Sequence, residues 1–313
     1  MILDRVERLS KDRRDRIYQG TDLLDSWIRQ LLSQGTEVLR KDPHRIEDMA
    51  TRAVDYGMPA VGRRLRLIPH RMSQDLHWSD FVMEEISYLL LVIRAVRSSA
   101  SESLVHPEDL MTALGVSLRK QDVINHTEPV EDDWLYLGSR KETEENILVS
   151  RNWFFGLNHQ RYALFLEFQV NRFVKLRQFN LGKMYYGYVH FYPSAIPLRV
   201  TGIPEADRPI PSTVSFKPHI VRDFQEIASK AFMANPFIRH MPACLARARV
   251  YSSAEGAFLA DDSGAGLVLD AKPEILQRTR AYCMDRELIL LGEYLDKHFT
   301  PISVFSQGFI EKI

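Results

Sequence analysis

The hydrophobic period of the sequence changes near the acidic stretch E-P-V-E-D-D at residues 128–133. Before it, apolar residues recur at intervals of three and four, which is the period of an amphipathic helix. After it, short aromatic and β-branched runs alternate with polar turns, as strands do. The sequence therefore predicts an α+β fold, with an N-terminal helical region followed by a mainly antiparallel sheet region with a few helices. We interpret the acidic stretch as a linker between a helical domain at residues 1–127 and an α+β domain at residues 128–313.

Three helices of the first region are defined by their apolar stripes, and Pro107 is expected to open a further short helix. The second helix begins after Pro43, and Gly57 with Pro59 ends it. The stripes predicted to face a core are Ile17, Leu24, Trp27, Ile28 and Leu31; Ile46, Met49, Ala50, Ala53 and Val54; and Phe81, Val82, Ile86, Leu89, Leu90 and Ile93.

The sequence predicts that the second region consists mainly of strands. They are predicted at residues 134–137, 147–149, 163–170, 184–192, 248–252, 256–260, 266–269, 287–295 and 301–305. Helices are predicted around Ile220–Ala231 and over 273–284, and the proline-rich segment 201–211 predicts a loop. In the strand at 163–170, Glu167 and Gln169 alternate with apolar residues, which predicts one wet face and one buried face that includes Phe168 and Val170.

The stretch Y-V-H-F-Y-P-S-A-I-P-L-R-V at residues 188–200 raises the question of an active site. In a strand, Tyr186, Tyr188, His190 and Tyr192 share one face. Such a face could stack on a ligand, but it more often packs under another element. Pro193 cannot donate a ladder hydrogen bond, so it fixes the end of the strand. We therefore interpret His190 as a structural residue.

The charge and cysteine content exclude some classes of protein. Lys plus Arg equals Asp plus Glu at 41 each, which gives no general attraction for nucleic acid or an acidic membrane. The longest apolar run, near residues 88–93, is far shorter than a membrane span. Cys244 and Cys283 do not make a disulfide framework, so a reducing cytoplasm is the expected location.

One basic cluster stands out in the sequence G-R-R-L-R-L-I-P-H-R at residues 62–71. Its members could line up on phosphates as an anion or nucleic-acid contact. Alternatively, they are the solvated face of a helix whose Val61, Leu65 and Ile68 are buried, and the zero net charge favours this second interpretation. The cluster consists of Arg63, Arg64, Arg66, His70 and Arg71.

The common catalytic signatures are missing from the sequence, including a complete phosphate-binding loop, H-E-x-x-H and G-x-S-x-G. The turn D-D-S-G-A-G at 261–266 holds two carboxylates and a serine, but Asp and Gly are ordinary hairpin residues. No two of the ten histidines are three or four residues apart. We therefore expect no catalytic residues, no metal and no cofactor, although a site assembled by the fold remains an alternative.

Several motifs, in order along the chain, resemble the bacterial SWIM zinc finger family proteins in the region that follows the finger. The segment F-Y-P-S-A-I-P-L-R at 191–199 is similar to one of theirs, and D-L-L-D-S-W-I-R-Q-L-L-S-Q-G at 22–35 resembles an early helix. Further counterparts are A-T-R-A-V-D-Y-G-M-P-A-V-G-R-R-L-R at 50–66, W-L-Y-L-G at 134–138, R-N-W-F-F-G at 151–156, A-N-P-F-I-R-H-M-P-A-C-L at 234–245 and G-E-Y-L-D-K-H-F-T-P-I-S-V-F at 292–305.

The Cys-x-Cys and Cys-x-His pattern of the finger itself is absent from this chain. The resemblance therefore implies either the part of a longer or split protein that follows the finger, or a relative without the metal. It also implies an accessory or adaptor protein without enzymatic activity, whose partners are a MoxR-type AAA+ ATPase and a von Willebrand A protein. Two alternatives stay open: a nucleic-acid-binding accessory protein that uses the 62–71 cluster, and an enzyme with an unrecognised site.

Overall fold

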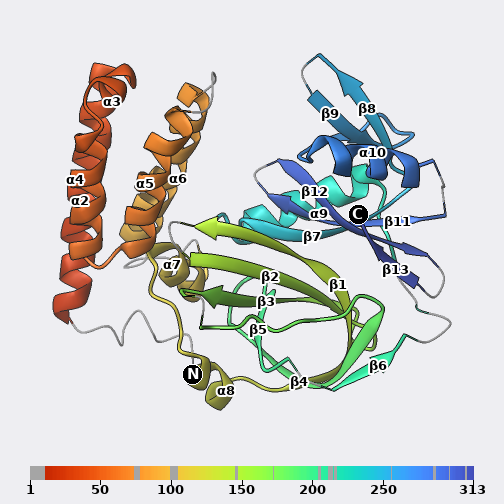
Figure 1. Cartoon of the computed structure of the whole chain (residues 1–313). Helices are drawn as coiled ribbons and strands as arrows, with labels where there is room; N and C mark the ends of the chain where they lie inside the picture. Colours follow the sequence, from red (N-terminus) through yellow and green to blue (C-terminus); the bar gives the residue numbers. More distant parts are fainter. Residues whose placement is uncertain are drawn as a thin grey trace. The chain divides into compact units, whose positions relative to one another are not determined.

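A computed structural model shows the fold of the chain (Figure 1). It describes residues 11–73, 78–98, 105–144, 147–171, 173–203, 206–210, 214, 217–254, 256–284, 287–295, 297–306 and 309–313. The chain divides into two compact units. The helical unit comprises the chain up to Arg119 together with Pro193–Ile196 and Ala234–Phe237, and the sheet unit comprises the remainder. The predicted boundary between residues 127 and 128 stays a prediction.

The helical unit is built around one apolar core. Its helices are α2 (Lys11–Gln34), α3 (Glu37–Lys41), α4 (His44–Asp55), α5 (Pro59–Met72), α6 (Trp78–Ser98) and α7 (Pro107–Leu114). Prolines open α5 and α7, where the missing N–H has no intrahelical partner to lose. Gly115 ends α7 with φ +90°, and a Cβ there would meet the backbone of Ala60 at 2.6 Å, so glycine allows this close approach.

Two short segments from later in the chain complete this unit, and both belong to motifs singled out in the sequence. The backbone N–H of Ala195 donates to the buried carboxylate of Asp109 at 2.9 Å. The side chain of Asn235 accepts from the N–H of Phe237 at 2.9 Å, and the Phe237 ring is buried with the edge-to-face partner Tyr88. The P-S-A-I motif at 193–196 and the A-N-P-F motif at 234–237 therefore take part in the packing of the helical unit.

Most of the predicted stripes are buried, but two positions are wrong. Leu90 is 38% exposed and Val54 is 39% exposed, while Val92 is buried in place of Leu90. A stripe follows a 100° step per residue, so Leu90 lies beyond the edge of the face that Leu89 and Val92 share. The short helix α8 (Lys120–His126), which belongs to the sheet unit, had no separate prediction.

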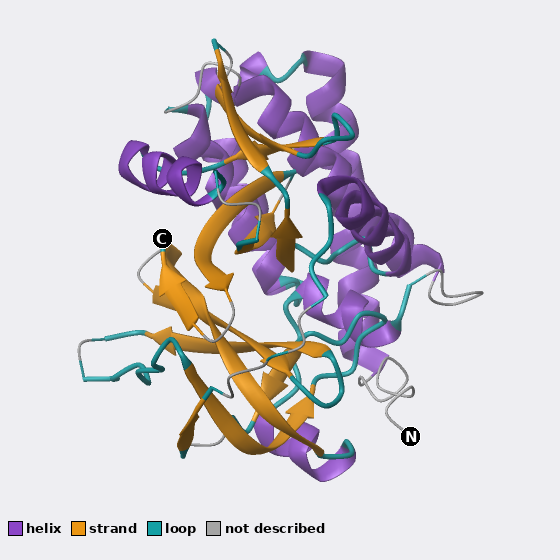
Figure 2. Ribbon diagram, turned by 90° about the vertical axis from the view of Figure 1, so that its right-hand side faces the viewer, coloured by secondary structure: helices purple, strands orange, loops and turns teal. Residues whose placement is uncertain are grey.

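The first sheet of the sheet unit closes on itself. Its strands are β1 (Val130–Glu144), β2 (Ile147–Gly156), β3 (Arg161–Gln169), β4 (Lys183–Phe191), β5 (Arg199–Thr201) and β6 (Asp207–Pro209). They follow the order β1-β2-β3-β5-β4-β6, and β1 also pairs with β4. Five strands thus form a small barrel in which only the β3–β5 pair is parallel. Figure 2 shows the twist of these strands. The barrel interior is aromatic, with Trp134, Tyr136, Phe154, Tyr185 and Phe191 among its residues.

The second sheet has seven strands and packs on the outer face of the barrel. It contains β7 (His240–Ala246), β8 (Arg249–Ser253), β9 (Gly256–Ala260), β10 (Gly266–Leu269), β11 (Ile289–Leu295), β12 (His298–Ser306) and β13 (Phe309–Lys312). Their order is β7-β11-β12-β10-β9-β8, with β13 paired to β12. A shared apolar core joins barrel residues such as Trp153 and Phe155 to Leu291 and Ile302. The remaining helices are α9 (Val221–Ala234) and α10 (Pro273–Tyr282), and Phe224 of α9 meets Tyr294 of β11 edge to face.

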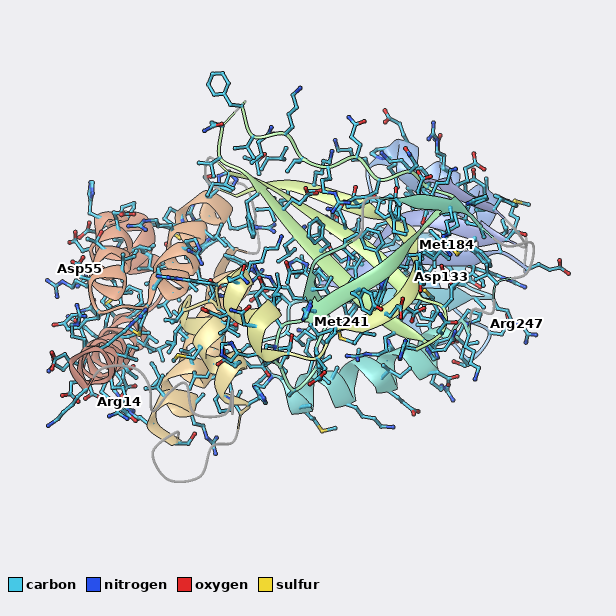
Figure 3. The ribbon with its side chains drawn as sticks, turned by 90° about the horizontal axis from the view of Figure 1, so that it is seen from below. Arg14, Asp55, Asp133, Met184, Met241 and Arg247 are labelled. Carbon is cyan, nitrogen blue, oxygen red and sulfur yellow. The ribbon has the colours of Figure 1, made fainter. Side chains whose placement is uncertain are left out.

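The α+β class and the mainly antiparallel pairing are confirmed. Strand β7 was missed because Pro242 interrupts its pattern, and β7 tolerates the proline as the edge strand of its sheet. Figure 3 labels its buried Met241 and the exposed Arg247, which follows the strand with φ +55°. Strand β13 was also missed. The predicted loop at 201–211 contains Thr201 of β5 and all of β6, while 204, 205 and 211 lie outside the described residues.

The acidic linker predicted at 128–133 is wrong, because Val130–Asp133 begin strand β1. Asp132 is fully buried there, and its carboxylate accepts backbone N–H groups from Asn158 and His159 at 2.8 Å each. It also lies 3.0 Å from Nδ1 of His159. The burial of this charge is offset by hydrogen bonds that close the turn between β2 and β3, a long-range pairing that the local composition does not reveal.

Candidate functional site

The basic cluster at 62–71 lies on α5, whose Val61, Leu65 and Ile68 are buried. Two of its arginines are held by carboxylates of neighbouring helices. Arg64 donates two hydrogen bonds of 2.7 Å to Glu85 and stacks 3.5 Å above the Tyr88 ring. Arg66 lies 2.8 Å from Glu47. Their charges are therefore largely compensated within the unit.

The other three members of the cluster are exposed. Arg63 and His70 are on the surface of α5, and Arg71 lies 5.5 Å from the centre of the Phe81 ring. The cluster thus does not present five aligned cations, since Arg64 and Arg66 serve ion pairs. That Arg63, His70 and Arg71 contact an anion stays a prediction.

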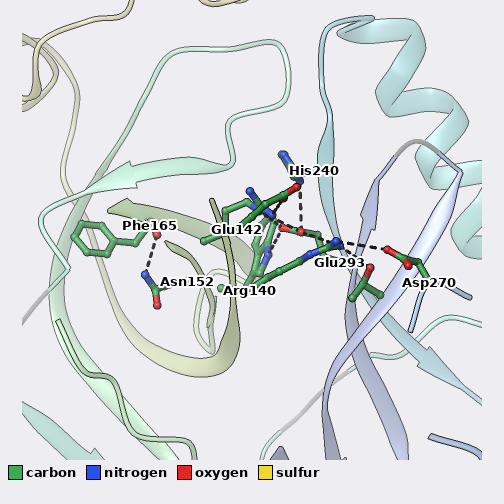
Figure 4. Close-up of polar contacts among 10 residues, drawn as sticks. Arg140, Glu142, Asn152, Phe165, His240, Asp270 and Glu293 are labelled. Atoms are coloured by element: carbon green, nitrogen blue, oxygen red, sulfur yellow. Dashed lines mark hydrogen bonds and ion pairs between the residues drawn. The ribbon is translucent and has the colours of Figure 1, made fainter. Parts of the chain in front are cut away.

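The sheet unit contains a larger polar cluster between the barrel and the second sheet, which no sequence signal indicated (Figure 4). Its centre is the ion pair between Arg151 of β2 and Glu293 of β11, with Nε–Oε distances of 3.1 and 3.2 Å. Both side chains are at most 2% exposed. The indole N–H of Trp153 also donates to Glu293, at 3.0 Å. Arg151 additionally binds Glu142 of β1 at 2.7 Å.

More exposed groups surround this pair. Arg140 of β1 donates to Thr300 at 2.5 Å and lies 3.5 Å from Asp270 and 3.8 Å from Glu293. His240 Nδ1 is 3.5 Å from Glu293 Oε2. The two groups are close enough to attract each other electrostatically, but the geometry is not that of a hydrogen bond. Burial by itself would raise the pKa of Glu293, but His240, Arg151 and Trp153 outweigh it and lower the pKa to about 2. A carboxylate that stays ionised at neutral pH is a poor proton donor and a very weak base.

Two small hollows lie beside the sheets of this unit. One is lined by apolar groups that include Leu137, Trp153 and Cys244, and the other lies beside Tyr282 and Cys283; each encloses about 10 Å³, which is room for about one water molecule. Both are below the usual size of a ligand pocket, and neither collects charged side chains. Burial raises the pKa of Cys244 to about 12 and that of Cys283 to about 11, so neither thiol is a reactive nucleophile.

Among the described residues, no three His, Cys, Asp or Glu side chains come together where they could hold a metal ion. The pair of Asp132 and His159 is the arrangement nearest to a catalytic dyad, because the buried carboxylate could orient the exposed imidazole. The carboxylate already accepts two backbone N–H groups of the same turn, which is a structural task.

The tyrosine face of β4 does not pack under another element, contrary to the expectation. Tyr186 is 40% exposed and Tyr188 is 55% exposed. The hydroxyl of Tyr186 donates to Glu131, and this carboxylate raises the pKa of both tyrosines. His190 Nδ1 lies 3.1 Å from the carbonyl oxygen of Thr127 and 3.2 Å from its hydroxyl. These contacts tie β4 to the end of α8 and fit the structural role predicted for His190.

The barrel has the strand pairing of an OB-fold, a class that often binds oligonucleotides on the outer face of its second and third strands. Here Trp153 and Phe155 of β2 and Leu164 of β3 point to that face, but they pack against Leu291 and Ile302 of the second sheet. The face that would bind a nucleic acid is therefore occupied by the chain itself, and the topology alone does not establish a function.

An apolar loop tip, which we define as Phe168, Val170, Phe173 and Val174, is exposed at the end of β3 and in the loop that follows it. The exposed fractions are 46, 63, 94 and 42%, in that order. The sequence suggested instead that Phe168 and Val170 face a core, because they alternate with polar residues. Strand alternation distinguishes two faces of a strand but does not say which one is covered. Here the strand ends at Gln169, near the barrel rim.

Comparison with known protein families identifies one region of the chain. Residues 12–114 match the SWIM-associated four-helix bundle domain. The resemblance to SWIM proteins is thereby confirmed for the helical unit, and this domain indicates an accessory or interaction role. It is not a known catalytic family. No curated protein and no solved structure is significantly similar to the chain. No helix in the described part of the chain is long and apolar enough to cross a lipid bilayer.

Proposed function

We propose that this chain is a non-enzymatic adaptor of the bacterial cytoplasm that works with a MoxR-type AAA+ ATPase and a von Willebrand A protein. The observation that carries the proposal is the SWIM-associated four-helix bundle domain at residues 12–114. The two partners are those that the resemblance to SWIM zinc finger family proteins implies.

The chemistry of the polar clusters supports an adaptor over an enzyme. The Arg151–Glu293 and Arg64–Glu85 pairs satisfy their charges internally, and the hollows beside the sheets are small and apolar. An enzyme needs a titratable group near neutral pH that faces a substrate-sized cavity. The exposed apolar loop tip is instead the kind of surface that binds another protein.

The nucleic-acid alternative is less well supported. Arg64 and Arg66 of the basic cluster are engaged by carboxylates, and the outer face of β2 and β3 is covered. A nucleic-acid binder gains affinity from several free cations that release counterions from phosphates, and loses it steeply with salt.

The adaptor proposal is tested with purified proteins. The chain is mixed with a MoxR-type ATPase and a von Willebrand A protein of its own bacterium, and binding is measured by interferometry and size-exclusion chromatography at physiological salt. We expect a complex with at least one of them at micromolar concentration. The absence of binding to both, together with tight salt-sensitive binding of a DNA or RNA duplex, would replace the proposal by the nucleic-acid alternative.

A further inference from the structure

We infer that the apolar loop tip, Phe168, Val170, Phe173 and Val174, is a docking site in which Phe173 inserts into an apolar pocket of a protein partner whose pocket is bordered by carboxylates. This inference deepens the proposed adaptor function and rests on it. Four large apolar side chains within seven residues are all more than two-fifths exposed at the tip. Single exposed apolar residues are ordinary, whereas a contiguous group on a soluble surface marks an interaction site.

Side-chain hydrogen bonds restrain the backbone of the tip at Phe173 and Val174. The side-chain oxygen of Asn171 accepts the backbone N–H groups of Phe173 at 3.0 Å and of Val174 at 3.2 Å. The side-chain amide of Gln169 donates to the carbonyl oxygen of Val174 at 2.5 Å. These hydrogen bonds restrain the backbone that carries Phe173, which lowers the entropic cost of association. Aromatic anchors of this kind carry a large share of the binding energy at protein interfaces.

The charges next to the tip favour a partner that carries carboxylates. Residues 168–182 contain no acidic residue, while Arg172, Lys175 and Arg177 are cationic in the sequence. Lys175 is exposed next to the tip. The nearest carboxylate in the sequence, Glu167, precedes the tip and already accepts hydrogen bonds from the Asn152 side chain and the backbone N–H of Arg177. A pocket with a carboxylate rim therefore complements the tip, and the charges favour encounter more than they add to affinity.

The experiment uses the full chain and the two purified proteins named above. Phe173→Ser removes the anchor, and Met233→Ser is the matched control, because Met233 is 74% exposed on α9 in the same unit. Both variants should keep the melting temperature of the wild type. We expect Phe173→Ser to weaken binding at least tenfold and Met233→Ser to change it less than twofold. Lys175→Glu should slow association several-fold at low salt, whereas Lys230→Glu on α9 should not.

Four results would overturn the inference. If the wild type binds a partner and Phe173→Ser binds equally well, the tip is not the docking site while the adaptor proposal stands. If the wild type binds neither protein, the adaptor proposal fails and the inference with it. If the wild type binds phosphatidylserine vesicles and Phe173→Ser does not, the tip is a membrane-binding site instead. A wild-type dimer that Phe173→Ser converts to a monomer, by light scattering, would assign it to a second copy of the chain.

Discussion

The two units each contain an arginine–glutamate pair, and the pairs differ in how far apart their members lie along the chain. Arg64 and Glu85 join adjacent helices and are 21 residues apart. Arg151 and Glu293 join a barrel strand to the second sheet and are 142 residues apart. The helical pair is at the edge of its core, with Arg64 stacked on Tyr88, whereas the sheet pair is enclosed. The same kind of ion pair therefore holds adjacent helices together in one unit and joins strands that are distant in the sequence in the other.

Replacement of Glu293 by Gln is expected to have the largest effect on stability. It leaves the guanidinium of Arg151 buried with Glu142 as its remaining carboxylate partner at hydrogen-bonding distance. Loss of one partner from a buried ion pair destabilises a protein by about 3–5 kcal/mol. Urea unfolding of the wild type and the variant at pH 7 measures this. A loss below about 1 kcal/mol would show that the sheet pair does not secure the two sheets.

The same pair predicts a dependence on pH. The pKa of Glu293 is lowered from 4.5 to about 2 in the folded protein, so the pair stabilises the fold fully above the unfolded value. That stabilisation should fall as the pH drops from about 4.5 to about 2, because the unfolded chain takes up the proton first. The gap in unfolding free energy between wild type and Glu293→Gln should narrow over this window, and a constant gap would contradict the assignment.

Replacement of Glu85 by Gln is expected to have an intermediate effect. The hydrogen bonds of Arg64 to a carboxylate are replaced by weaker ones, while the guanidinium keeps its stacking on Tyr88 and some contact with water. The expected loss is about 1–3 kcal/mol. Thermal unfolding followed by circular dichroism at 222 nm reports on the helices. If this loss exceeded that of Glu293→Gln, the ranking of the two pairs would be reversed.

The smallest effect is expected for Arg66→Ala, which removes the exposed pair with Glu47. Side chains of both residues are at least 32% exposed, so water and salt screen the interaction. An exposed pair contributes about 0–1 kcal/mol. In 0.5 M NaCl the difference in unfolding free energy between the wild type and Arg66→Ala should be smaller still, because salt screens the pair. A loss as large as that of Glu85→Gln would mean that the basic cluster on α5 is more than a solvated surface.

The sequence predicted the helical unit better than the sheet unit for a physical reason. Helical stripes depend on residues three and four apart, so the burial of Ile28, Leu65 and Val82 could be anticipated locally. A signal for the ion pair was also present, since Glu85 lies on the buried side of α6 between Val82 and Leu89. A charged residue on an apolar stripe indicates a partner on a neighbouring helix.

The sites of the sheet unit depend on pairings that no local pattern contains. Glu293 stands inside the run L-L-G-E-Y-L, and its partner Arg151 is fixed only when β2 and β11 meet across two sheets. Asp132 looked like part of a linker because its hydrogen-bond donors come from the turn after β2. Phe168 looked buried because alternation indicates two faces without telling which one the rest of the chain covers.

We infer that the polar clusters of this chain are structural and that its function resides on its surface. The most direct test measures how tightly the Glu142→Gln variant binds the partner protein. This change lies at the half-exposed end of the Arg151 cluster and leaves the enclosed Arg151–Glu293 pair intact. We expect the dissociation constant of Glu142→Gln to lie within twofold of the wild-type value, while Phe173→Ser weakens binding at least tenfold. A loss of more than tenfold in Glu142→Gln, with unchanged melting temperature, would contradict the account and assign the cluster to recognition.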